Sequence, residues 1–236
     1  MKILGIESSS LVASVAVVTD DILTAEYTVN FKKTHSQTLL PMIDQVMNML
    51  EMEPADLDAI AVAGGPGSFT GLRIGGATAK GLGLALKKPL IHVPTVDAMA
   101  CNLWGSKALV CPVMDARRNQ VYTGLYHVGG SLEIVKAQCA MDMGELIACL
   151  NDIGEPVIFL GDGVSVCRRQ IEEQMRTEFS FAPASHNRQR AASVAALAVE
   201  YYKKGLFEDA ADFVPDYLRK SQAEREREEQ NGQVDA

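Results

Sequence analysis

The chain has 236 residues, of which 47% are hydrophobic and 22% are charged, and its formal net charge is −8. This size and composition are ordinary for a globular protein with a substantial core, and no apolar run is long enough to span a membrane. The acidic balance argues against a protein that grips nucleic acid by itself, because such proteins usually carry a basic patch.

The first half of the chain predicts three strands, a helix, a fourth strand and a second helix. Short apolar runs between Gly, Ser and Asp turns indicate the strands, and apolar residues three and four apart indicate the helices. The predicted strands cover residues 2–7, 13–19, 22–29 and 57–63, and the helices cover residues 35–50 and 77–86.

The second half repeats this order of elements. Its predicted strands cover residues 108–114, 120–127, 132–137 and 157–160, and its helices cover residues 143–150 and 164–175. Two βββαβα lobes of this kind are the layout of the actin/hexokinase/Hsp70-like (ASKHA) α/β fold, in which two similar lobes flank a cleft. We expect lobes at residues 1–106 and 107–220, with a joining helix at 96–104, further helical and closing segments at 191–204 and 213–219, and a charged, disordered tail at 221–236.

A glycine-rich loop with the sequence GGPGSFTGLRIGG covers residues 64–76, between the fourth strand and the second helix. Ser68 is suited to cap the helix. Gly71, Gly75, Ala79 and Gly83 recur every four residues and therefore share one helix face. Because glycine weakens a helix by about 1 kcal/mol relative to alanine, something must approach this face closely, either the sheet beneath or another helix. A tight, closely packed turn and a ligand site both remain open for the loop itself.

The extended run GGPGSFTGLRIGGATAKGLGLAL strongly resembles the TsaB (YeaZ) family, and less closely its paralogue TsaD. The opening MKILGIESSS, the segment THSQTLLP at 34–41 and the segment PDYLR at 215–219 fit the same family. The resemblance implies the ASKHA fold and a cytoplasmic, non-catalytic subunit that dimerises with TsaD and stabilises it. With the ATPase TsaE, that complex forms N6-threonylcarbamoyladenosine at position 37 of tRNAs that read ANN codons, so tRNA is contacted mainly through the complex.

The helix predicted at 35–50 carries an apolar stripe wider than a helix lying on a sheet requires. A second helix of the same chain could cover the surplus, but we favour a partner chain, which also predicts a weak homodimer when the protein is alone. The predicted partner-interface residues are Leu39, Leu40, Ile43, Val46, Met47, Leu50, Phe69, Thr70, Arg73 and Ala77.

The inter-lobe cleft suggests a different function class, an autonomous ATPase or kinase that uses Glu7 and Asp115 at the ends of the first strands of the lobes. We rank it below a cleft without chemistry, because neither Gly turn contains Arg or Lys to hold phosphates. No cofactor of its own is expected, with ATP or ADP shared at the partner interface as the one candidate.

Metal and protease chemistry rank lower still. The four histidines contain no pair within one helical turn, and the five cysteines contain no C-x-x-C pair, so we expect no metal and reduced thiols. A glycoprotease-like peptidase based on His35 and Ser36 is a distant third, because adjacent helix residues point about 100° apart. The first residues also lack the features of a secretory signal.

Overall fold

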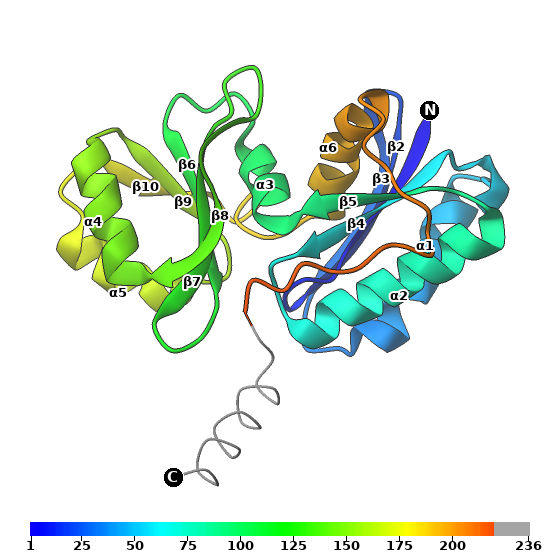
Figure 1. The fold of residues 1–236 in the computed structure, drawn as a ribbon, viewed down its shortest axis with the longest axis horizontal. Helices are drawn as coiled ribbons and strands as arrows, with labels where there is room; N and C mark the ends of the chain where they lie inside the picture. The colour runs from blue at the N-terminus through cyan, green and yellow to red at the C-terminus, as the bar shows by residue number, and fades with distance from the viewer. Residues whose placement is uncertain (220–236) are drawn as a thin grey trace, which may run out of the picture.

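The computed structural model describes residues 1–219, so the tail predicted at 221–236 lies outside the described residues. Two five-stranded sheets lie side by side, each with helices packed on its faces (Figure 1).

The first sheet has the strand order β3-β2-β1-β4-β5. Strands β1 to β3 form an antiparallel meander, whereas β4 and β5 run parallel to β1. The bounds are β1 Lys2–Glu7, β2 Val12–Thr19, β3 Ile22–Asn30, β4 Ala59–Gly65 and β5 Leu90–Pro94.

Both faces of the first sheet are covered, which explains why its central strands read as continuous apolar runs. Alternate residues point to opposite faces, so Leu4 and Ile6 pack under α1 (His35–Met49) and α2 (Phe69–Leu86). Ile3 packs on the other face against α6 (Ala191–Lys203). The chain therefore returns from the second sheet to complete the core of the first.

The second sheet has the order β10-β9-β6-β7-β8, which repeats the order of the first. This correspondence confirms the predicted duplication and the ASKHA-type fold. The strands are β6 Leu109–Asp115, β7 Gln120–His127, β8 Glu133–Asp142, β9 Val157–Leu160 and β10 Phe179–Phe181. The helices α4 (Met143–Ile153) and α5 (Val164–Gln174) cover one face, and α3 (Thr95–Ala100) packs on the other.

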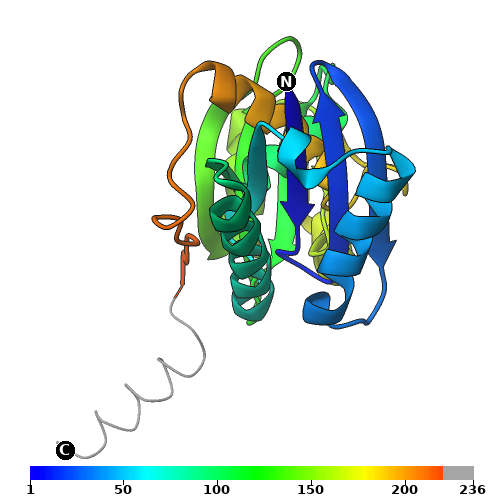
Figure 2. The ribbon, with the colours of Figure 1, turned by 90° about the vertical axis from the view of Figure 1, so that its right-hand side faces the viewer.

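Two short 3₁₀ turns, Pro54–Asp56 and Cys101–Leu103, complete the regular elements of the described chain. After α6, residues 206–219 run back along the outer side of α2, and we call them the return segment (Figure 2). Leu90 of β5 and Glu208 exchange two backbone hydrogen bonds of 3.0 and 2.9 Å where this segment begins. The return segment then reaches the glycine-rich loop, so it connects the two ends of α2.

Candidate functional site

The glycine-rich loop leads directly into α2, which begins at Phe69, earlier than the predicted residue 77. The Ser68 hydroxyl accepts a 3.3 Å hydrogen bond from the Gly71 N–H, which confirms the predicted cap. The small-residue face predicted from the fourfold spacing is buried against the chain itself. A Cβ on Gly71 or Gly75 would collide with Ser8 at the end of β1, so the close neighbour is the sheet and not another protein.

The structure corrects the assignment of four predicted interface residues on α1. Leu39, Ile43, Val46 and Met47 are at most 6% exposed and belong to the core of the first lobe. The wide apolar stripe is covered by the strands beneath and by the neighbouring α2, which is the alternative that the sequence left open.

The remaining predicted residues do reach the surface. Leu40 is 54% exposed and Leu50 is partly buried at the end of α1. On α2, Thr70, Arg73 and Ala77 are exposed and Phe69 is half-buried. Further exposed residues of these two helices that the predicted interface set left out include Met49, Gly81 and Ala85. We call the exposed sides of α1 and α2 together the helix face; it is shown in Figure 2, where the two helices lie side by side.

One end of the helix face carries an aromatic and cationic cluster. The Arg73 guanidinium carbon lies 4.0 Å from the centroid of the Phe69 ring. The Tyr217 ring, from the return segment, packs on Phe69 with 4.7 Å between centroids, and its hydroxyl accepts a 3.3 Å hydrogen bond from Arg73 Nε. Sequence reasoning found Phe69 and Arg73 but missed Tyr217, because no local pattern connects it to α2.

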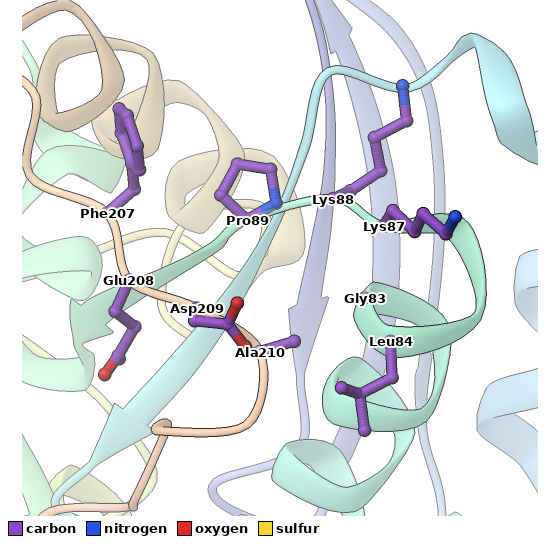
Figure 3. Close-up of a pocket in the computed structure, with 9 residues that line it drawn as sticks. All are labelled: Gly83, Leu84, Lys87, Lys88, Pro89, Phe207, Glu208, Asp209 and Ala210. Carbon is purple, nitrogen blue, oxygen red and sulfur yellow. The ribbon is translucent and has the colours of Figure 1, made fainter.

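A groove of about 510 Å³ lies at the opposite end of α2, between the last turn of that helix, with Leu84 and Lys87, and residues Phe207 and Glu208 of the return segment (Figure 3). Its walls carry both acidic and basic side chains, including Lys88 and Asp209. The groove therefore offers no single charge to a ligand, and it lies apart from the cluster around Arg73.

The cleft residues named by the alternative hypothesis occupy different environments. Glu7 is 1% exposed and accepts a 2.6 Å hydrogen bond from the Ser9 N–H. Burial is the main cause that raises the pKa of the Glu7 carboxyl, which stands at about 7. Hydrogen bonds from Ser9 oppose this rise, and the nearby Asp162 carboxylate adds to it. Asp115 instead forms a 2.9 Å ion pair with Arg117. Glu7 and Asp115 therefore do not form a matched pair of free carboxylates. The acidic residue of the second lobe that raises the pKa of Glu7 is Asp162.

The four histidines are dispersed in the fold. His35 contacts the Ser10 carbonyl at 2.8 Å, and His92 lies 3.5 Å from Asp216. Within residues 1–219 no three His, Cys, Asp or Glu side chains gather in a way that could hold a metal ion. In the same part of the chain, no helix combines the length and apolarity needed to cross a membrane.

Comparison with known proteins places this fold among named relatives. The family model described as TsaD, tRNA N6-adenosine threonylcarbamoyltransferase, matches residues 26–227. The tRNA threonylcarbamoyladenosine biosynthesis protein TsaB of Bacillus subtilis is 36% identical over 228 residues, which are 95% of this chain and 96% of the relative. The Escherichia coli protein of the same name is 35% identical over 53% of this chain and 55% of its own length.

Solved structures agree on the fold. YeaZ from Pseudomonas aeruginosa superposes with a TM-score of 0.79 at 24% identity, covering 92% of this chain and 99% of the other. A dehydratase component from Acidaminococcus fermentans reaches a TM-score of 0.51 at 13% identity, covering 90% of this chain and 100% of the other. The full-length similarity to the Bacillus subtilis protein, together with the matching family model, shows that the chain belongs to the TsaB (YeaZ) family.

Proposed function

We propose that this chain is a non-catalytic subunit that binds and stabilises a TsaD-like threonylcarbamoyltransferase. The complex forms N6-threonylcarbamoyladenosine at position 37 of tRNAs that read ANN codons, with a TsaE-like ATPase as a further component. The observation that carries this proposal is the similarity, over 95% of the chain, to a relative named as a tRNA threonylcarbamoyladenosine biosynthesis protein.

The exposed helix face supports a binding role. It presents Leu40, Met49 and Ala77 to solvent on two adjacent helices, so a partner that covers this face would remove their apolar surface from water. Small side chains at Ala77 and Gly81 allow close approach of a partner helix. The same face supports the weak homodimer proposed for the isolated chain, and ATP or ADP is proposed to bind only where the two subunits meet.

The chemistry of the cleft residues favours this role over the ATPase or kinase alternative. Asp115 is paired with Arg117, and Glu7 is buried and accepts a hydrogen bond from the Ser9 N–H, so both carboxylates are already engaged within the chain. The cleft instead resembles a polar junction between the lobes, where the Gln189 side-chain amide donates a 2.9 Å hydrogen bond to Asp162.

The test is co-expression of this chain with the TsaD-like protein of the same cell. We expect a stable complex in size-exclusion chromatography and loss of threonylcarbamoyladenosine from tRNA, measured by mass spectrometry, when the gene for this chain is depleted. ATP hydrolysis by the purified chain alone, abolished by Glu7→Ala, would instead support the alternative. Tagged chain that never retains the TsaD-like protein would contradict the proposal.

A further inference from the structure

The cluster on α2 holds one arginine in a fixed position on an otherwise exposed surface. The Arg73 guanidinium lies over the Phe69 ring in a cation–π contact, with 4.0 Å from its carbon to the ring centroid. Its Nε donates to the Tyr217 hydroxyl over 3.3 Å. Two independent contacts therefore restrain a side chain that is normally mobile on a protein surface.

The return segment holds Tyr217 in place from both sides. Before it, Asp216 N–H donates a 2.7 Å hydrogen bond to the Gly64 carbonyl, and Lys80 Nζ donates to the carbonyl of Phe213 at 3.0 Å. After it, Arg219 donates a 2.6 Å hydrogen bond to the Ala116 carbonyl of the second lobe. The segment that carries Tyr217 is thus held by the glycine-rich loop, by α2 and by the second lobe. The conformational entropy of the Tyr217 and Arg73 side chains is therefore lost on folding, before any partner binds.

The support leaves part of the guanidinium without an acceptor. Arg73 Nε is used by Tyr217, but among residues 1–219 no hydrogen-bond acceptor or acidic side chain contacts the two terminal nitrogens of Arg73. By comparison, Arg117, Arg168 and Arg190 each form an ion pair within the chain. The terminal nitrogens of a guanidinium form a planar fork that matches the two oxygens of a carboxylate.

We propose that Phe69, Arg73 and Tyr217 form an anchor that receives an Asp or Glu side chain of the TsaD-like partner. This inference rests on the proposed function and gives that interface one defined polar contact at the start of α2. Arginine and tyrosine, held rigidly, are the residue types that contribute most binding energy at protein interfaces. A protein carboxylate is favoured over an RNA phosphate because the chain carries a net charge of −8, which repels a polyanion at long range.

The experiment measures the dissociation constant between the full chain and the purified TsaD-like partner by isothermal titration calorimetry at two salt concentrations. Arg73→Ala is expected to raise the Kd about 10- to 100-fold and to flatten its salt dependence. Arg73→Lys, which keeps the charge but not the fork, is expected to restore only part of the affinity. Tyr217→Phe keeps the ring and removes the positioning hydrogen bond, so a smaller loss of a few-fold is expected.

Arg169→Ala is the matched control, because Arg169 is 89% exposed on α5 of the other lobe. It should leave the Kd unchanged, and all variants should melt near the wild-type temperature. An unchanged Kd for Arg73→Ala, with binding still abolished by Ala77→Arg, would overturn the anchor and leave the proposed function standing. Failure of the wild-type chain to bind the partner would overturn both. Arg73-dependent binding of a tRNA anticodon stem-loop by the chain alone would reassign the site to phosphate and reject the carboxylate.

Discussion

Ser8, directly after β1, donates a 2.9 Å hydrogen bond from its hydroxyl to the Gly71 carbonyl in the first turn of α2. The same hydroxyl lies where a Cβ on Gly75 would stand. Helix α2 therefore rests on the end of β1 with no space between them. This contact positions the start of α2, and with it the exposed residues on the opposite side of the helix.

Gly75→Ala tests this close packing. The added methyl group must displace Ser8 or lift α2, so we expect a loss of about 1–3 kcal/mol in the free energy of unfolding, measured by urea denaturation. Gly81→Ala is the matched control on the exposed side of the same helix, where nothing lies within 4 Å of an added Cβ. It should stabilise the chain by up to about 1 kcal/mol. Equal effects of the two substitutions would show that α2 does not rest on Ser8.

The small-residue face of α2 illustrates what the sequence could predict and what it could not. The fourfold spacing of Gly71 and Gly75 correctly predicted a close neighbour, but a sheet and a partner helix demand the same small residues. The apolar stripe that contains Ile43 was wrongly assigned to a partner for a related reason. Its width shows that more than the sheet covers α1, but the sequence does not show that the additional cover is α2 of the same chain. Periodicity reports that a face is covered and does not report what covers it.

Local patterns also predicted most strands and the duplication of the lobes, because alternating apolar runs survive in each half. They missed β5 and β10, which are only five and three residues long and lie at the edges of their sheets. Tyr217 was missed as a site residue because its contact with Phe69 joins segments far apart in the chain. Contacts of this kind depend on the path of the return segment, which no short motif specifies.

Tyr126→Phe tests the junction between α3 and the second sheet. The Tyr126 hydroxyl donates a 2.7 Å hydrogen bond to Asp97, and both side chains are buried. Burial raises the pKa of Asp97, and the hydrogen bond from Tyr126 lowers it, so the tyrosine helps to keep the carboxylate charged. Without the hydroxyl we expect a loss of about 1–3 kcal/mol at neutral pH. Tyr27→Phe, at a tyrosine that is 37% exposed, should change stability little; a similar loss there would refute a specific role for the buried pair.

Glu7→Gln is expected to remove a pH dependence of stability. The buried carboxyl keeps its proton up to about pH 7, whereas the unfolded chain releases it near 4.5. Between these values the folded state binds more protons, so the free energy of unfolding falls as pH rises and becomes level above pH 7. This contribution to the free energy of unfolding amounts to roughly 3 kcal/mol at most, from about 1.4 kcal/mol per pH unit.

Because glutamine does not titrate, the free energy of unfolding of Glu7→Gln should rise relative to that of the wild type from pH 5 to pH 7. Above pH 7 the difference between the two proteins should stay constant. Urea denaturation at pH 5, 6, 7 and 8 gives the comparison, and curves that stay parallel throughout would contradict the raised pKa.

The last prediction separates the surface of the helix face from the core beneath it. Leu40 is 54% exposed and Ala77 is also exposed, so Leu40→Glu and Ala77→Arg should leave the melting temperature of the isolated chain near that of the wild type. Ile43 is 6% exposed, and a carboxylate placed there loses its hydration without gaining a partner. Ile43→Glu is therefore expected to unfold or aggregate the chain, and its loss of binding would carry no information about the interface.

If the helix face binds the TsaD-like protein, Leu40→Glu and Ala77→Arg should each weaken the complex at least tenfold, or about 1.4 kcal/mol, in a titration. The two act differently, since Leu40→Glu buries a charge in the interface while Ala77→Arg blocks close approach of the partner helix. Val166→Glu provides the control, because Val166 is 67% exposed on α5 and lies outside the helix face. The control should bind normally. Variants at Leu40 and Ala77 that stay folded and retain both wild-type affinity and tRNA modification would place the partner on another surface of the chain.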